Sequence, residues 1–354
     1  MLGDGIGPEV VPASVRAIQA TPGVRRGDVV IEWVHLPVGW QSYRESGQTL
    51  PESTLEELVG LDGWILGPIG HMDYPRDDPG AVNPHPIIRK RFSLHSNIRP
   101  ARSHSAIDSI HQDVDLVIIR ENNEGFQPDR NMFRGWGEFM PSPDMVLSSR
   151  VITRANSEFV ARTAFELARQ RDAGKRVTVV HKSTVFKMGC GLFAECCRDV
   201  SRDYPDVQCD EIIVDTFAMR LVMRPQEFDV VVTTNMFGDI LSDEAAGLVG
   251  GLGMAPGLCV GPRYAMAQAT HGSAPDIAGE GIANPYAMIV SAGMLISWLG
   301  HRADDSTAVE SGEAVVWAVD EVVAAGDSVT PDLGGSSRTG EMAEAVIERL
   351  VASN

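Results

Sequence analysis

Hydrophobic positions recur along the chain with two different periods, and the two periods alternate from one end to the other. Short apolar runs rich in β-branched residues predict strands at Val29–Val34, Gly63–Gly67, Asp115–Arg120, Arg176–His181, Glu211–Val214 and Asp229–Thr234. Amphipathic stretches predict helices at Glu9–Gln19, Thr54–Val59, Asn156–Arg171 and Pro285–Leu299. Strands that alternate with helices in this way are typical of an α/β fold.

Length and charge narrow the class of protein. The chain has 354 residues, which favours roughly two domains. It carries 30 Lys and Arg against 48 Asp and Glu, a formal charge of −18. This balance argues against a nucleic-acid binder and against a polybasic membrane-surface protein, since both need a basic face. No uninterrupted apolar run reaches the roughly 18 residues of a membrane span.

The cysteines and the first residues indicate a compartment. Five cysteines, an odd number without CxxC spacing, favour free thiols in a reducing environment. The first ten residues show neither a basic stretch nor an apolar core of a signal peptide. We therefore expect a cytoplasmic protein.

The first candidate motif is a glycine-rich turn, Gly3–Glu9, that leads into a predicted helix. Its glycines follow GxGxG spacing rather than GxGxxG, so the Rossmann fingerprint does not apply. Glycine-rich turns between elements are often purely structural, and the sequence leaves both interpretations open.

Three arginines on separate elements form the second candidate. Arg89 lies in a cluster of basic residues, and Arg99 precedes a proline, which favours an extended backbone. Arg120 ends a strongly apolar strand, where its charge needs a partner or a ligand. Guanidinium groups bind carboxylates in pairs of hydrogen bonds, so the three together suit a small polycarboxylate. The alternative is a solvated helix face.

A pair of aspartates gives the sharpest local signal. Asp239 and Asp243 follow a predicted strand and open a helix, and their spacing of four places both on one face. Two such carboxylates repel each other unless a cation lies between them, and Mg²⁺ or Mn²⁺ fits oxygen ligands. Compensation of the helix dipole is the competing explanation.

Lys182 and one polar loop complete the candidates. Lys182 directly follows a predicted strand, and it is either a surface charge or a proton-transfer group beside a cation. The loop His271–Asn284 is rich in glycine, proline and polar residues. It is either a plain structural loop or a site whose amides and side chains bind an anion and an adenosine.

Taken together, these motifs closely resemble the β-decarboxylating dehydrogenases, which comprise isocitrate, 3-isopropylmalate, homoisocitrate and tartrate or D-malate dehydrogenases. The resemblance extends from Gly3 to Gly335, and Asn235–Asp243 and His271–Pro285 match the family signatures nearly residue for residue. It implies an isopropylmalate-dehydrogenase-like fold with a mixed central sheet, not a Rossmann fold. It also implies a large dinucleotide-binding domain, residues 1–94 and 250–354. A small domain, residues 95–249, would carry the metal and substrate residues and the dimer interface.

The resemblance further implies roles for individual residues. The substrate carboxylates would bind to Arg89, Arg99 and Arg120. The ion, Mg²⁺ or Mn²⁺, would bind to Asp215, Asp239 and Asp243. Lys182 would assist deprotonation of the substrate hydroxyl, with Lys182 and Asp215 reaching the site from the partner in a homodimer. The dinucleotide would contact His271, Gly272, Ser273, Ala274, Asp276, Ile277 and Asn284. Asp276-Ile277 replaces the Lys-Tyr pair of NADP-dependent relatives, which favours NAD.

Three positions depart from the family pattern. Gln127 stands where the family has a tyrosine that protonates the product, and Thr184 belongs to a Lys-Ser-Thr segment that replaces Lys-Ala-Asn. His85 occupies the position, one turn before Arg89, that discriminates substrates. His85 is typical of neither isocitrate nor isopropylmalate enzymes and favours a polar or anionic substituent.

We therefore expect oxidation, with β-decarboxylation, of a malate-type 2-hydroxy di- or tricarboxylic acid. NAD and Mg²⁺ or Mn²⁺ are the expected cofactors, and the expected partners are this small anionic hydroxy acid and a second copy of the chain. Nucleic acid and membrane are not expected partners. Two alternatives remain: dehydrogenation without decarboxylation, because glutamine cannot act as a general acid, and a catalytically silent regulatory subunit.

Overall fold

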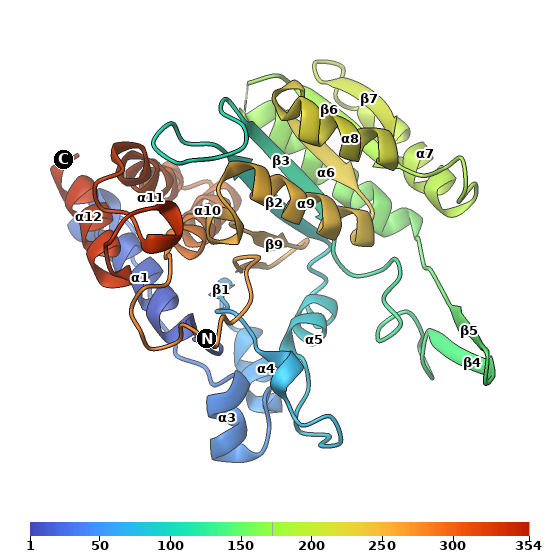
Figure 1. Ribbon diagram of the computed structural model, residues 1–354, viewed down its shortest axis with the longest axis horizontal. Coiled ribbons are helices and arrows are strands. Elements are labelled where there is room, and N and C mark those ends of the chain that lie inside the picture. Colours follow the sequence, from blue (N-terminus) through green and yellow to red (C-terminus); the bar gives the residue numbers. More distant parts are fainter. Residues whose placement is uncertain (172, 354) are drawn as a thin grey trace.

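One mixed sheet of eight strands forms the centre of the molecule (Figure 1). The computed structural model describes residues 1–171 and 173–353. In spatial order the strands are β1 (Gly63–Ile65), β10 (Ala265–Ala267), β9 (Leu258–Val260), β2 (Ser96–Arg102), β3 (Asp115–Glu121), β8 (Val230–Thr233), β6 (Arg176–His181) and β7 (Gln208–Ile213). β9 and β2 run antiparallel to both of their neighbours, and the remaining pairs are parallel. The predicted α/β class and mixed sheet are confirmed.

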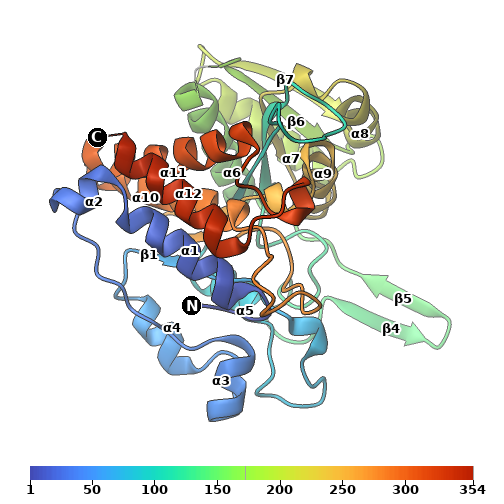
Figure 2. The same ribbon diagram turned by 60° about the vertical axis from the view of Figure 1, so that its left-hand side comes forward.

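Helices cover both faces of the sheet. α1 (Gly7–Gln19), α10 (Tyr286–Ala303), α11 (Ser306–Ala325) and α12 (Thr339–Ala352) pack together, which brings the two ends of the chain into one layer (Figure 2). α6 (Arg154–Arg171) and α7 (Gly189–Ser201) pack on one face of β3, β8 and β6. α8 (Val214–Met223) and α9 (Asn235–Val249) pack on the opposite face. Because successive strand residues point to opposite faces, these buried strands read as continuous apolar runs.

The remaining elements are short. The other helices are α2 (Pro22–Arg26), α3 (Gly39–Ser46), α4 (Glu52–Leu58) and α5 (Pro84–Arg91), with 3₁₀ turns η1 (His71–Asp73), η2 (Pro225–Glu227), η3 (Leu252–Met254) and η4 (Pro331–Leu333). β4 (Glu138–Ser142) and β5 (Met145–Ser148) form a hairpin that projects away from the body (Figures 1 and 2). Every residue of its two strands is exposed. Among the described residues, no helix is long and apolar enough to cross a bilayer.

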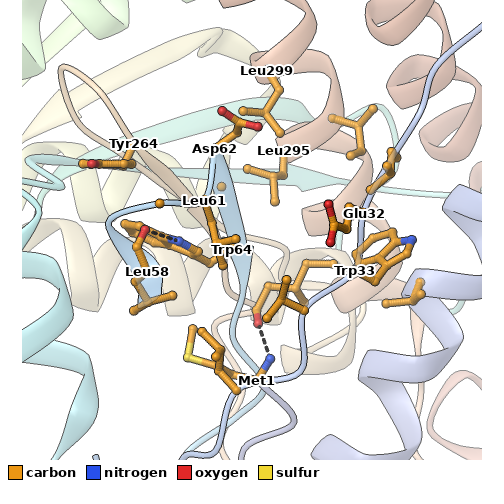
Figure 3. A pocket seen from close by; sticks show the side chains of 18 of the residues that line it. Met1, Glu32, Trp33, Leu58, Leu61, Asp62, Trp64, Tyr264, Leu295 and Leu299 are labelled. Atoms are coloured by element: carbon orange, nitrogen blue, oxygen red, sulfur yellow. Dashed lines mark hydrogen bonds between the residues drawn. The ribbon is translucent and has the colours of Figure 1, made fainter. Parts of the chain in front are cut away.

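Most predicted elements are confirmed to within three residues, but the strand predicted at Val29–Val34 is wrong. Within the described part of the chain this segment forms neither a helix nor a strand. A cavity of about 1120 Å³ separates it from the edge strand β1 (Figure 3). Trp33 stands on one side of that cavity and Trp64 of β1 on the other. The β-branched residues of this run favour a strand by propensity, but four of its six residues are exposed, and a strand also needs a partner edge.

The central sheet continues across the predicted domain boundary. β9, from residues assigned to the large domain, pairs with β2, the first strand assigned to the small domain. The division into residues 1–94 with 250–354 and residues 95–249 stays a prediction.

Candidate active site

Three buried arginines meet at the centre of the sheet. Asn97 on β2 lies directly opposite Arg120 on β3 in the antiparallel register, so their side chains share a face of the sheet. Arg99 is two residues beyond Asn97 and therefore lies on the same face as Arg120. Arg89 comes from α5, and its charge lies close enough to lower the pKa of both Arg99 and Arg120. Burial, together with the charge of Arg99, lowers the pKa of Arg120 to about 9. The buried Nε atoms of Arg89 and Arg99 have no hydrogen-bond partner among the described residues.

The two aspartates of α9 compensate part of this charge. The Arg99 guanidinium lies 3.1 Å from Oδ1 of Asp239 and 3.7 Å from Oδ1 of Asp243, and Arg120 binds the same oxygen of Asp239. Arg99 therefore compensates part of the charge of both carboxylates, and the Mg²⁺ or Mn²⁺ expected between them stays a prediction. Burial opposes ionisation of Asp239, but Arg120 and Arg99 outweigh it and hold the pKa of Asp239 below its ordinary value. Burial raises the pKa of Asp243, and Arg99 offsets only part of that rise.

Close packing between strand and helix depends on one glycine. A Cβ at Gly238 would lie 2.6 Å from Cβ of Arg120. Only a residue without a side chain lets α9 approach β3 closely enough for Asp239 to reach Arg120.

The aspartates suit a divalent ion only in part. Both carboxylates remain about half exposed, at 51 % and 53 %, and offer the oxygen atoms that Mg²⁺ or Mn²⁺ takes. Within the described residues, however, no three His, Cys, Asp or Glu side chains converge on one point. Asp215 is thus not brought to Asp239 and Asp243 in one chain. The donor set fits the metal if a third carboxylate arrives from outside the chain.

Lys182 and Asp215 form a separate pair. β6 and β7 run parallel with His181 beside Ile213, so Lys182 and the first turn of α8 emerge at the same edge of the sheet. Lys182 donates a hydrogen bond to Asp215, and this bond holds the pKa of Asp215 below its ordinary value. Asp215 is two-thirds exposed, at 66 %. The pair faces outward beside the exposed apolar residues of α8, which are Met219, Val222 and Met223.

Two neighbours of this pair have simpler roles. His181 bonds to Glu211 at 3.1 Å, which makes it a satisfied buried histidine. Thr184 lies exposed in the turn after β6, and its predicted contact with substrate and nicotinamide stays untested.

Gln127 reaches the arginine cluster through Asn235, a residue that the sequence analysis did not single out. Gln127 Nε2 donates to Asn235 Oδ1 at 3.0 Å, and Arg120 donates to the same oxygen at 2.7 Å. Behind them, Glu121 accepts a hydrogen bond from the amide of Asn235 at 3.3 Å. Burial, and then the charge of Glu121, raises the pKa of Glu124 to about 7. The polar run directly after the apolar strand β3 was the signal for this network.

Gln268 is the second residue that the sequence analysis missed. It follows β10 and lies between two predicted substrate residues of α5: its amide contacts Arg89 and His85, each at 2.8 Å. In the sequence, only its position directly after a strand and three residues before His271 could have identified Gln268 as a site residue.

The predicted dinucleotide residues lie on one loop against the glycine-rich turn. Ile6 N donates to Ser273 O at 2.9 Å, and a Cβ at Gly5 would lie 1.8 Å from that same oxygen. Asp4 anchors the turn by accepting hydrogen bonds from the backbone of Trp40 and Gly70 and from the Tyr74 hydroxyl. The turn therefore has a structural role: it holds the loop at the start of α1.

Within that loop the side chains differ in how firmly they are held. Asn284 is buried and donates to Asp332 at 2.9 Å, whereas Asp276 is exposed. The Nε2 atom of His271 is buried without a partner among the described residues. Gly272, Ala274 and Ile277 lie on the same loop.

Comparisons with known proteins agree on one family. The family model described as isocitrate/isopropylmalate dehydrogenase matches residues 1–346. The isocitrate/homoisocitrate dehydrogenase of Thermus thermophilus is 40 % identical over 98 % of this chain and 96 % of its own length. The 3-isopropylmalate/3-methylmalate dehydrogenase of Methanocaldococcus jannaschii is 39 % identical over 98 % and 97 %.

A solved structure leads to the same conclusion. The isocitrate dehydrogenase of Methylococcus capsulatus superimposes with a TM-score of 0.83 at 39 % identity, covering 99 % of this chain and 98 % of that one. Enzymes of this family are oxidoreductases that oxidise and decarboxylate hydroxy acids with NAD(P) and a divalent metal. The chain belongs to the isocitrate/isopropylmalate dehydrogenase family.

Proposed function

We propose that the protein oxidises a malate-type 2-hydroxy di- or tricarboxylic acid with NAD and Mg²⁺ or Mn²⁺, and that it releases the β-carboxylate as CO₂. The observation that carries this proposal is the cluster of Arg89, Arg99 and Arg120 beside Asp239 and Asp243. It combines three buried guanidinium groups, which would bind the carboxylates of a hydroxy acid, with two half-exposed carboxylates, which would bind a divalent ion.

Substrate binding falls to the arginines. The Nε atoms of Arg89 and Arg99 have no hydrogen-bond partner among the described residues, and the charge of Arg89 lowers the pKa of Arg99. Because each like charge raises the electrostatic potential at the others, a dianionic substrate relieves repulsion when it binds. This local field explains how a chain of formal charge −18 attracts an anion.

The metal and the dinucleotide have separate binding residues. Asp239 and Asp243, with Asp215 of the partner subunit, would hold Mg²⁺ or Mn²⁺, and the loop 271–284 would hold the adenosine half of NAD. The exposed carboxylate of Asp276 repels a 2′-phosphate and accepts a bond from a ribose hydroxyl, which supports NAD over NADP. When bound, NAD accepts a hydride and the metal supplies a Lewis acid next to the substrate oxygens.

Lys182 holds and moves the proton of the substrate hydroxyl in this proposal. Asp215 keeps the ammonium group in place through its hydrogen bond. Because both residues face outward beside the apolar surface of α8, we propose a homodimer in which each chain completes the site of the other. The projecting hairpin β4–β5 exposes Phe139, Met140 and Leu147, a second apolar surface that a dimer would cover.

Dehydrogenation without decarboxylation is a second candidate, and Gln127 favours it. The side-chain amide of Gln127 cannot act as a general acid. It donates a hydrogen bond to Asn235, which also accepts one from Arg120. Decarboxylation then requires water or another group to protonate the product.

The proposal is tested with a panel of malates, tartrates, isocitrate, homoisocitrate and 3-isopropylmalate, with NAD and Mn²⁺, read by NADH absorbance. One CO₂ per NADH supports decarboxylation, and NADH without CO₂ supports the second candidate. No turnover of any of these acids, by a folded dimer, would favour the regulatory subunit and overturn the proposal.

A further inference from the structure

We propose that Gln268 is a positioning residue that holds Arg89 in place and keeps His85 as a neutral hydrogen-bond donor to the substrate, which selects substrates with an oxygen atom on the C3 substituent. This inference rests on the proposed function, which it sharpens from hydroxy acids in general to one class. Two contacts of α5 with Gln268, directly after β10, carry it, together with the shared face of His85 and Arg89.

The first step fixes the orientation of the Gln268 amide. An Arg89 Nη atom lies 2.8 Å from one end of this amide. Because a guanidinium only donates hydrogen bonds, the end that faces Arg89 is the carbonyl oxygen. The NH₂ group of Gln268 therefore points the other way, toward His85, at 2.8 Å.

The second step fixes the proton on His85. An NH₂ group only donates, so the Nε2 atom of His85 accepts and carries no proton. A ring in this state is neutral and protonated at Nδ1. Burial is the main cause that lowers the pKa of His85 well below its ordinary value. The charges of Arg89 on α5, His71 on η1 and Arg130 in the loop after β3 act in the same direction.

The third step concerns what Nδ1–H meets. His85 precedes Arg89 by one helical turn, so both side chains lie on one face of α5. The His85 ring bonds to Gln268 through Nε2, and its Nδ1 atom has no hydrogen-bond partner among the described residues. A hydroxyl or carboxylate oxygen on C3 would accept it. An alkyl group would leave the donor without a partner, which typically disfavours binding by about tenfold or more.

The direct test observes the ring rather than turnover. ¹⁵N-histidine NMR of the intact dimer, with the His85 signals assigned by loss in His85→Asn, reports the tautomer and the titration. The expected result is a neutral ring protonated at Nδ1 in the wild type from pH 8 to pH 5. Gln268→Glu places a carboxylate against Nε2 and is expected to raise the pKa of His85 by at least about one unit. Gln226→Glu, at an exposed position of η2, adds the same charge elsewhere and should leave the ring unchanged.

A kinetic test measures selection. We compare kcat/KM for tartrate with kcat/KM for 3-methylmalate. The wild type should favour tartrate by about tenfold or more, and Gln268→Leu should reduce that ratio about tenfold, since it frees the ring to change tautomer. A ring protonated at Nε2 in the wild type, or an unchanged ratio in a folded Gln268→Leu dimer, overturns the inference. If no acid is turned over, the proposed function fails, while the NMR result still decides the state of His85.

Discussion

Two groups of charged residues in the candidate active site are built in opposite ways. The arginine–aspartate cluster, formed by Arg99, Arg120, Asp239 and Asp243, is internal, and its guanidinium groups are less than a tenth exposed. The pair Lys182–Asp215 lies at the surface, with Asp215 mostly in solvent. The cluster joins residues of three elements inside one chain, whereas the pair meets no third carboxylate among the described residues. This difference is what the proposed division of the site between two subunits would explain.

The largest expected effect comes from removing the ammonium group of the surface pair. Lys182→Met should lower kcat by about 10²–10⁴-fold, the range of general acid–base catalysis. Thermal stability should hardly change, because the ion pair is exposed. Steady-state kinetics and a melting curve check both. The neighbouring exposed Lys187→Met is the matched control, and wild-type kcat in Lys182→Met would remove Lys182 from the mechanism.

Subunit mixing tests the division of the site directly. Lys182→Met and Asp243→Asn damage different groups of charged residues, so each homodimer should be nearly inactive. After co-refolding, half of the dimers are hybrids with one intact site each, and activity should recover to about a quarter of wild type. If each chain held a complete site, no recovery would appear.

Removing one carboxylate should destabilise the protein in the arginine–aspartate cluster but not in the Lys182–Asp215 pair. Asp239→Asn leaves two buried guanidinium groups without their shared partner, and we expect the free energy of unfolding to fall by about 1–3 kcal/mol, since Asp239 is itself half exposed. Asp215→Asn should be nearly neutral. Urea unfolding of both variants measures this, and equal losses would contradict the contrast.

A smaller effect concerns pH near the internal cluster. Burial raises the pKa of Glu124 to about 7, so the folded state binds its proton more tightly than the unfolded chain does. The protonated Glu124 therefore contributes to the free energy of unfolding. That contribution is present in full below about pH 4 and is lost as the pH rises through 7. We expect the free energy of unfolding to decline by about 1–3 kcal/mol between pH 5 and pH 8 through this group. Glu124→Gln should flatten that decline, whereas Asp210→Asn, at a surface strand, should not.

Much of the fold was predictable from local patterns. Arg176–His181 forms the strand predicted, and Asp239 and Asp243 do share a face of α9 because a spacing of four matches the helical repeat. The segment Val29–Val34 was not predictable in the same way. Its β-branched residues favour a strand, but a strand also needs a partner edge within hydrogen-bond distance, and β1 lies across a cavity.

The sequence by itself determined the α/β class, the family and the chemical types in the site. Only the tertiary structure decided that Arg99 contacts both aspartates of α9 and that Asp215 pairs with Lys182 instead of joining them. It alone showed that Gln268 joins His85 to Arg89 across 183 and 179 positions of the chain. The reason is physical: periodicity and motif spacing are local properties, whereas charge pairing and amide orientation depend on which distant elements the sheet brings together.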